Sequence, residues 1–382
     1  MAVGDGAFRG DGPLSTERKR VLLLGASGNV GHAATERFLR ERDFDVVAVS
    51  RRQPDFGERQ RYVHLQVDLS SRDAVARLGG DVSSVTHVVY AALFEGPSLI
   101  AGWTDEEQIA SNRQMLSNVI DAAAAAHAPI EHFSILQGTK AYGYHIGKMR
   151  IPGKERYSRV VHPNFYWEQE DRLRAAAREM GFSYTIFRPQ FIFGGVIGVA
   201  MNLIPVIGAY AAICKELGRP FSYPGGASYV AEAVDSRLLA DALCWAARSP
   251  AARNETFNIT NGDVFEWRDL WGSLGQMLGV EAGPDHALSL ASWLPRQAGV
   301  WERIVERHNL RPVALDKLLG LSHQYADDAF AYTADGTPLP SRATPVFLST
   351  IKLRRAGFGA CIDTEEMFAY WFGRLREERI LP

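Results

Sequence analysis

Cysteine is scarce in this chain of 382 residues, which contains only Cys214, Cys244 and Cys361. The three positions lie far apart, and their spacing matches neither a zinc site nor a disulfide framework. We therefore expect no bound metal, and we expect the thiols to be buried and inert.

Long uninterrupted apolar runs are also missing. The best candidate covers residues 191–214, but it is rich in glycine, contains Asn202 and Pro205, and leads into Lys215 and Glu216. Because a membrane span needs about 20 predominantly apolar residues, we expect this segment to line an apolar pocket instead. Residues 1–16 are polar and glycine-rich, so they predict a flexible extension rather than a signal peptide, and hence a cytoplasmic protein.

Charge of one sign does not predominate. The chain has 42 basic and 44 acidic residues, and its formal net charge is −2. A basic excess would be needed for a nucleic-acid partner, and none is present. With 46% hydrophobic residues the chain can bury a large core, in one large domain or two fused ones. These features favour an enzyme that acts on a small molecule, without a nucleic-acid or membrane partner.

A strand, a glycine-rich loop and a helix follow one another near the start. An apolar run at 20–24 precedes Gly25-Ala26-Ser27-Gly28-Asn29-Val30-Gly31, and a helical pattern continues to Arg42. Gly25 permits a tight turn, Gly28 lets the backbone approach a pyrophosphate, and Gly31 lets the helix pack on the strand. The pattern predicts a dinucleotide-binding loop, and the alternative is a tight turn without a ligand. The loop residues expected to contact the cofactor also include Ser27, Asn29 and Val30.

The ends of the next strands indicate which dinucleotide is bound. A strand at 45–50 ends in Ser50-Arg51-Arg52, where proteins specific for NAD present an acidic residue. Two guanidinium groups instead offer bidentate contacts to a 2′-phosphate, which favours NADP, although a solvated strand end would look the same. Asp68-Leu69, after a strand at 62–67, is expected at the adenine, and Ala91-Ala92 ends a strand at 86–92 that passes under the cofactor.

Two further segments carry residue types suited to catalysis, Leu136-Gln137-Gly138-Thr139-Lys140 and Asn164-Phe165-Tyr166. Together with other segments spread over nearly the whole chain, they resemble the progesterone 5β-reductase and iridoid synthase-like enzymes, an atypical branch of the short-chain dehydrogenases with bacterial members. The other matching segments are the glycine loop, Ser50-Arg51-Arg52, Thr86-His87-Val88, Glu170-Asp171, Arg188-Pro189 with Phe193-Gly194, Tyr210-Ala211-Ala212-Ile213-Cys214, residues 258–263 and 363–364, and Ile380-Leu381-Pro382.

The resemblance implies an α/β fold of the extended short-chain dehydrogenase type. A Rossmann-type doubly wound parallel sheet would occupy residues 17–195, and a smaller, mostly α-helical substrate lobe would occupy 196–382, with some segments returning to the sheet. Dimers occur among the relatives, so a homodimer is also expected.

The resemblance further implies NADPH-dependent 1,4-reduction of an activated carbon–carbon double bond in a hydrophobic enone or enal, steroid-like, terpenoid-like or smaller. Tyr166 would stabilise or protonate the enolate oxygen. Ordinary short-chain dehydrogenases place a lysine four residues after this tyrosine, but Glu170 stands there, so Lys140 is the expected partner that raises the acidity of Tyr166 and holds the ribose.

The remaining site residues follow from the same resemblance. Beside Lys140 and Tyr166, the cofactor is expected to contact Gln137 and the strand end at Pro189, Phe191 and Ile192. The substrate pocket is expected to include Met149, Phe193 and Asn202.

Two departures from the family pattern concern the pocket. Gly147-Lys148-Met149 replaces the usual Gly-Pro-Phe, which suggests a softer pocket wall and a different or broader substrate set. Residues 333–342 form a longer connection than usual, either a lid or a passive surface loop. Two other functions remain open, a carbonyl reductase or epimerase with the same fold and a non-catalytic NADP-sensing protein. Tyr166 argues against the second of these, and Glu170 argues against the first.

Overall fold

The computed structural model describes residues 18–57, 59–333, 336–339 and 345–382. The predicted extension at 1–16 lies outside the described residues, as does part of the 333–342 connection. Among the described residues, none of the helices combines the length and the apolarity of a membrane span.

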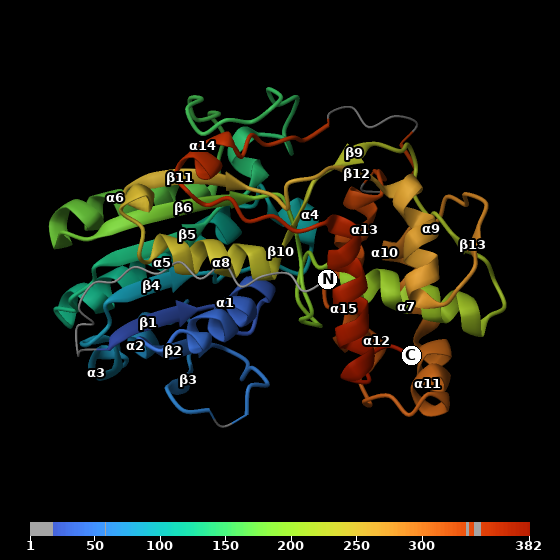
Figure 1. The fold of residues 1–382 in the computed structure, drawn as a ribbon, viewed down its shortest axis with the longest axis horizontal. Helices are drawn as coiled ribbons and strands as arrows, with labels where there is room; N and C mark the ends of the chain where they lie inside the picture. Colours follow the sequence, from blue (N-terminus) through green and yellow to red (C-terminus); the bar gives the residue numbers. More distant parts are fainter. Residues whose placement is uncertain (1–17, 58, 334–335, 340–344) are drawn as a thin grey trace, which may run out of the picture.

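A seven-stranded parallel sheet forms the larger part of the molecule (Figure 1), with the strand order β11-β6-β5-β4-β1-β2-β3. Its strands are β1 (Lys19–Leu24), β2 (Phe44–Ser50), β3 (Tyr62–Gln66), β4 (His87–Tyr90), β5 (His132–Leu136), β6 (Ser183–Pro189) and β11 (Glu255–Ile259). The chain order reverses between β1 and β4, and in open α/β sheets ligands bind outside the carboxyl ends of the strands at such a point. The predicted doubly wound sheet is confirmed.

Helices cover both faces of the sheet. The helices α1 and α8 pack on one face, whereas α5 and α6 pack on the other with α2 and α3. Because both faces are covered, the central strands β1, β2 and β4 carry nearly continuous apolar runs, as in residues 21–24, instead of alternating. The helices are α1 (Asn29–Arg40), α2 (Arg72–Ala76), α3 (Gly79–Val82), α4 (Leu99–Gly102), α5 (Glu106–Ala125), α6 (Phe165–Met180), α8 (Ser236–Ala246) and α14 (Ile351–Arg355), with the 3-10 turns η1 (Thr139–Tyr142) and η2 (Pro250–Ala252).

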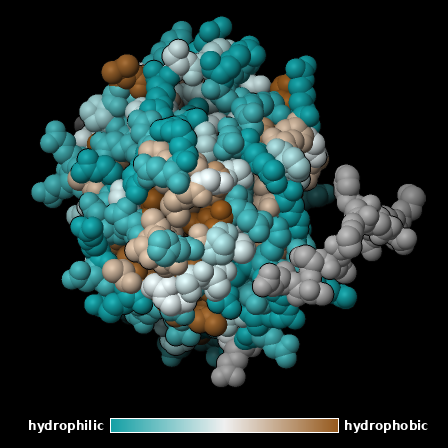
Figure 2. All heavy atoms as spheres, turned by 90° about the vertical axis from the view of Figure 1, so that its left-hand side faces the viewer, coloured by the Kyte–Doolittle hydropathy of each residue, from teal (hydrophilic) through white to brown (hydrophobic). Residues whose placement is uncertain are grey.

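One side of this part is mostly hydrophilic. Figure 2 looks onto the side of the molecule at the left of Figure 1 and shows apolar residues only in small groups among hydrophilic ones. The apolar residues of the sheet and its helices gather instead in two buried clusters, one on each face of the sheet.

The second lobe is mostly helical and lies at the right of Figure 1. Its helices are α7 (Leu203–Glu216), α9 (Trp267–Leu278), α10 (Leu290–Trp293), α11 (Ala298–Arg307), α12 (Leu315–Leu319), α13 (Ser322–Ala329) and α15 (Thr364–Glu377), with η3 (Leu294–Gln297). Short strand pairs complete it and join it to the sheet: β7 (Phe191–Phe193) with β10 (Ala233–Asp235), β9 (Val230–Ala231) with β12 (Phe265–Glu266), and β8 (Phe221–Ser222) with β13 (Ala282–Gly283).

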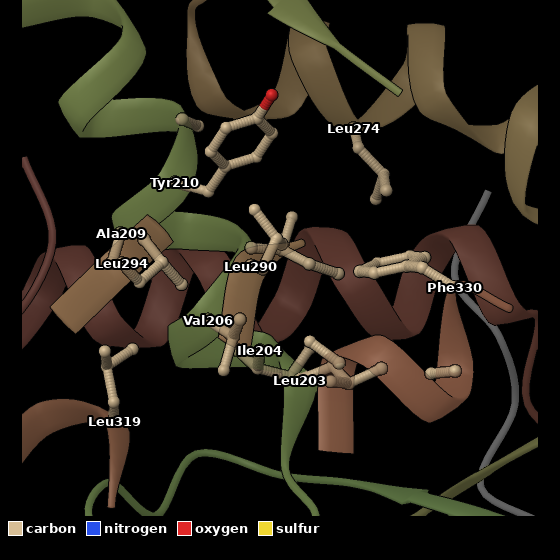
Figure 3. Packing of buried hydrophobic residues seen from close by; sticks show 14 of the residues in the cluster. Leu203, Ile204, Val206, Ala209, Tyr210, Leu274, Leu290, Leu294, Leu319 and Phe330 are labelled. Atoms are coloured by element: carbon tan, nitrogen blue, oxygen red, sulfur yellow. The ribbon is translucent and has the colours of Figure 1, made fainter. Parts of the chain in front are cut away.

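The helix α7 is the centre of this lobe's core. Residues 203–214 are buried on every side of the helix, and Figure 3 shows Val206 and Tyr210 surrounded by Leu290, Leu294 and Leu274. A helix that is apolar all round is a core helix. The expectation that the apolar segment 191–214 lines a pocket is therefore corrected for residues 203–214, which pack against other helices, whereas Ile192 and residues 198–201 do line a cavity.

Candidate active site

A cavity of about 830 Å³ lies at the carboxyl ends of β1, β2, β4, β5 and β6 and reaches the second lobe. Most of the residues that the sequence predicts for the site line this cavity. They are Gly25, Ser27, Gly28, Asn29, Val30, Ser50, Arg51, Arg52, Asp68, Leu69, Ala91, Ala92, Gln137, Lys140, Tyr166, Pro189 and Ile192. The structure thus brings the glycine loop, the two arginines and the Lys140–Tyr166 pair to one cavity.

The glycine loop forms the bend between β1 and α1. A side chain on Gly25, where φ is +88°, would place Cβ 2.6 Å from the Ala91 carbonyl oxygen, and a Cβ on Gly31 would lie 2.1 Å from the Gly25 carbonyl oxygen. Gly28 precedes α1, and the helix has neither a side-chain cap nor an acidic residue in its first turn. Its backbone N–H groups and its dipole are therefore available to an anion, which fits a pyrophosphate.

The arginines lie at the end of the cavity that the adenosine half of a dinucleotide would occupy. Arg51 and Arg52 are both exposed, and the Ser50 hydroxyl donates to the Arg52 carbonyl oxygen at 2.6 Å, which fixes the turn that carries them. Arg52 Nη1 also donates to the Gly198 carbonyl oxygen at 3.3 Å. Hydrogen bonds from the Ser70 backbone and hydroxyl lower the pKa of Asp68, which is thus a charged acceptor at this end.

The other end of the cavity holds the proposed catalytic pair. Lys140 Nζ lies 4.3 Å from the centre of the Trp103 ring and 6.0 Å from the centre of the Tyr166 ring. Tyr166 stands in the first turn of α6, because the Asn164 side chain caps the helix by accepting from the Tyr166 N–H at 3.0 Å. Gly138 leaves room for the phenol, since a Cβ there would lie 3.2 Å from Tyr166 Oη.

Burial has opposite consequences for the two members of this pair. It raises the pKa of the Tyr166 phenol, an effect that the Glu95 carboxylate increases and the Arg188 guanidinium reduces. Burial lowers the pKa of Lys140 to about 8, against the attraction of Glu95 and Asp328. A lysine with such a pKa can still be charged at neutral pH, and the phenol remains protonated, as a proton donor requires.

Glu170 occupies the position of the usual lysine, and it lies in a network of cations. Its carboxylate accepts from Gln137 Nε2 at 3.0 Å and from Arg174 Nε at 3.0 Å, and it pairs with Arg159 at 3.0 Å and Arg188 at 3.5 Å. Burial alone would raise the pKa of Glu170, but the hydrogen bonds from Gln137 and Arg159 and the charges of Arg159 and Arg188 lower it overall. Glu170 is absent from the cavity lining. The cations that act at Tyr166 are Lys140, which lies over its ring, and Arg188, which lowers the pKa of the phenol.

The residues expected in the substrate pocket lie elsewhere, which corrects that expectation. Met149 packs with Tyr142, Val346 and Leu348 in a separate small cluster. Phe193 packs against Trp267 and Phe368 in the core of the second lobe.

The remaining three expected residues also lie behind the cavity lining. Asn202 caps α7 and donates to the carbonyl oxygens of Gly194 and Val196. Phe191 meets Tyr325 edge to face, and Gly31 packs against Gly25. Each of these residues supports the cavity from outside rather than facing it.

The cavity is also lined by residues that the sequence did not identify. These are chiefly Glu95, Trp103, Tyr144, Gln190, Tyr325, the segment 198–201, and Gly320 with Leu321. One signal was available, because Glu95 lies shortly after the end of the apolar strand β4, and carboxyl ends of strands carry site residues in this fold. No local pattern marks Trp103 or Tyr325, which reach the cavity from separate helical segments.

Comparisons with known proteins agree with this geometry. Residues 21–260 match the model of the "NAD dependent epimerase/dehydratase family". The chain belongs to that family. An (S)-8-oxocitronellyl enol synthase of Camptotheca acuminata is 29% identical over 98% of this chain and 96% of its own length, and one of Nepeta racemosa is 30% identical over 94% and 91%. Within the family the chain is a member of the iridoid synthase-like branch predicted from its motifs.

Solved structures show the same fold at lower identity. UDP-glucose 4-epimerase of Thermotoga maritima, solved with UDP-glucose, superposes with a TM-score of 0.66 at 16% identity, over 94% of this chain and 99% of that one. The corresponding enzyme of Thermus thermophilus, solved with NAD, gives a TM-score of 0.63 at 16% identity, with the same coverage of both chains. The family is one of enzymes that depend on nicotinamide dinucleotides, and the cavity at the switch point fits such a cofactor.

Proposed function

We propose that this protein is an NADPH-dependent reductase of activated carbon–carbon double bonds, and that its substrates are small or medium-sized hydrophobic enones or enals. The observation that carries the proposal is the meeting of Lys140 and Tyr166 at one end of the cavity, while Glu170 is withdrawn into a network of arginines. This arrangement supplies a phenol and a cation in a site where the usual tyrosine–lysine helix turn is absent.

The cofactor would be held by the glycine loop at its pyrophosphate, by Arg51 and Arg52 at its 2′-phosphate, and by Lys140 at its ribose. When bound, NADPH would supply a hydride. The guanidinium pair, with no carboxylate at the end of β2, supports NADPH over NADH.

Tyr166 would act on the substrate carbonyl. When hydride reaches the β-carbon of an enone or enal, negative charge develops on the carbonyl oxygen, and the phenol donates a hydrogen bond or its proton to that oxygen. A preorganised donor of this kind is worth about 3 kcal/mol in the transition state. The charge of Lys140 favours the same transfer, because a nearby cation makes the phenol a better acid.

The cavity walls support a hydrophobic substrate. Side chains from both lobes give an apolar lining, including Phe94, Phe165, Val199, Met201 and Leu321. Apolar walls bind the carbon skeleton, and only the carbonyl needs a fixed hydrogen bond. The curated relatives are named for an enol product, and protonation on oxygen after hydride addition to the β-carbon of an enal gives an enol. A terpenoid-like enal is therefore a suitable first substrate to test.

The test is product analysis with NADPH carrying deuterium at the transferred position, on a panel of enals, enones, simple ketones and UDP-sugars. Deuterium at the β-carbon supports the proposal. Deuterium at a carbinol carbon would establish a carbonyl reductase, and epimerised sugar in parallel reactions supplied with NAD⁺ or NADP⁺ would establish an epimerase. No turnover in any of these reactions despite NADPH binding would favour a sensing protein. The domain boundary after residue 195, the homodimer and the cytoplasmic location stay predictions.

A further inference from the structure

Glu95 brings a carboxylate to the end of the cavity that holds Lys140. It follows β4 and lines the same cavity as Lys140 and Tyr166. One carboxylate oxygen accepts from Gln108 Nε2 at 2.6 Å, whereas the other oxygen is buried without a hydrogen-bond partner among the described residues. An unpaired buried carboxylate oxygen is costly, so its presence beside a catalytic lysine calls for a physical reason.

Several features fix Glu95 through Gln108. The Gln108 backbone N–H donates to the helix cap Asp105 at 2.8 Å, and Gln108 Oε1 accepts from the Gly96 N–H at 2.8 Å. The amide is thereby oriented with its nitrogen toward Glu95. Gly102 leaves the space for this side chain, because a Cβ there would lie 2.4 Å from Gln108 Oε1. The carboxylate is therefore held in place rather than merely allowed there.

Lys140 needs a counter-charge in this setting. It is buried, and its ammonium group lies over the Trp103 ring. Cation–π contact with one indole contributes about 0.5 to 2 kcal/mol, which is small beside the cost of burying an ammonium group. Without a nearby negative charge, burial would drive Lys140 toward its neutral form.

The charged and titratable groups that face Lys140 come from four segments. Glu95 follows β4, Asp328 lies in α13, Tyr166 in α6, and His145 in the loop after η1. Glu95 contributes the largest attraction and Asp328 the next. Burial lowers the pKa of His145 to about 4, so that His145 adds no positive charge at neutral pH.

We infer that Glu95 is a positioning residue for the catalytic pair, whose carboxylate serves as the counter-charge that keeps Lys140 protonated in the cavity. Its kinetic consequences rest on the proposed reductase function, whereas its effect on Lys140 can be measured without turnover.

The direction of the effect with pH distinguishes this role from a structural one. Loss of the Glu95 charge lowers the pKa of Lys140 and also lowers the pKa of Tyr166, because Glu95 raises both. Glu95→Gln should therefore be active at pH 6, where Lys140 stays protonated. As the pH is raised, Glu95→Gln should lose its activity at a lower pH than the unmodified enzyme does. A residue that only supports the fold would reduce activity equally across this range.

The experiment measures kcat/KM with NADPH and an accepted enal from pH 5.5 to 9.5 for the unmodified enzyme, Glu95→Gln, and the control Glu107→Gln, whose exposed carboxylate lies on α5 outside the cavity lining. The midpoint of the alkaline loss should fall by about one pH unit or more in Glu95→Gln. The ratio of activity at pH 6 to activity at pH 8 should then rise about fivefold or more, with no change in Glu107→Gln. A loss that is the same at every pH would overturn the inference.

A titration that needs no turnover completes the test. The chain has seven lysines, so the ¹³Cε signal of Lys140 can be assigned with Lys140→Met and followed against pH by NMR. The midpoint for Lys140 should fall in Glu95→Gln, and partly in Gly102→Ala, which displaces Gln108 without changing charge. An unchanged midpoint in Glu95→Gln overturns the counter-charge, even if the proposed reaction is correct. A lowered midpoint with no turnover of any enal would leave the counter-charge standing and refute the reductase.

Discussion

The two ends of the cavity are built in different ways. The end that would hold the adenosine half of the cofactor consists of consecutive residues, with the glycine loop at 25–31 and the pair Arg51-Arg52, and its charges are exposed. The reaction end combines Lys140, Tyr166, Glu95 and Trp103, which come from four separate segments, and its charges are largely enclosed. Exposed charges act mainly through their number and position, whereas enclosed charges act on one another's protonation.

The strongest test of the reaction end is removal of its hydroxyl. Tyr166→Phe should bind NADPH normally but lower kcat by about 10² or more, because the donor to the developing oxyanion is lost. Lys140→Met should add little once Tyr166 has been replaced, since the two residues form one unit. If the double variant instead showed the product of the two single effects in steady-state kinetics, the residues would act independently.

Lowering the pH should destabilise the sheet beneath the cavity through two buried histidines, rather than change the protonation of the catalytic pair. Burial lowers the pKa of His87 to about 4 and that of His132 to about 3, both from 6.5. The unfolded chain therefore takes up protons that the folded chain does not. The free energy of unfolding should be highest above pH 6.5, where both states bind the same number of protons at these histidines, and it should fall as the pH drops toward 4. The loss should reach about 3 kcal/mol for His87 alone.

Urea unfolding between pH 7.5 and 4.5 measures this loss. The variant His132→Gln should show a flatter dependence on pH than the unmodified protein. Unfolding free energies that stay constant from pH 6.5 to 4.5 would show that neither histidine is held neutral.

Backbone contacts determine which substitutions the glycine loop tolerates. Gly31→Ala places Cβ against the Gly25 backbone, and such overpacking should cost about 1 to 3 kcal/mol of stability and weaken NADPH binding. Gly80→Ala is the matched control, since a Cβ there meets nothing within 4 Å. Thermal unfolding and fluorescence titration with NADPH would measure both effects, and equal behaviour of the two variants would contradict the packing seen at Gly31.

The smallest expected effect lies at the exposed arginines. Replacing Arg51 and Arg52 by alanine should raise the KM for NADPH about tenfold or more, and that for NADH hardly at all, because the lost contacts are to the 2′-phosphate. Arg42→Ala, an exposed arginine outside the cavity lining, serves as the control. Equal use of both cofactors by the unmodified enzyme would exclude the proposed phosphate site.

The contrast between the two ends also explains what the sequence could predict. The glycine loop and Arg51-Arg52 are local patterns, and the structure places both on the cavity. Lys140 and Tyr166 were found through motifs typical of one branch of dehydrogenases. The contact of Lys140 with Trp103 could not be predicted, because it depends on how η1 and the end of α4 meet in three dimensions.

The second lobe was the least predictable part. Residues 203–214 are apolar on every face, which predicts burial but does not identify the partner, so the sequence does not distinguish a core helix from a pocket wall. The helices between 290 and 329 are short, with at most the 10 residues of α11, and such short runs do not show from the sequence how the helices pack together. Met149 was assigned to the pocket by its position in a motif, but Leu348 packs on it from a segment about two hundred residues away.

Lys140 and Tyr166 lie on two separate elements, η1 and α6. When a tyrosine and a lysine stand four residues apart on one helix, the helix geometry fixes their spacing and they move together. Here the spacing is set by tertiary packing between η1 and α6, which includes the hydrogen bond that the Asn164 side chain donates to the Lys140 carbonyl oxygen at 3.4 Å. Substitutions in the side chains that pack against η1 should therefore change the distance between the Lys140 ammonium group and the Tyr166 phenol without changing the sequence of α6. Such substitutions offer a way to adjust the acidity of the phenol for a larger or smaller carbonyl compound.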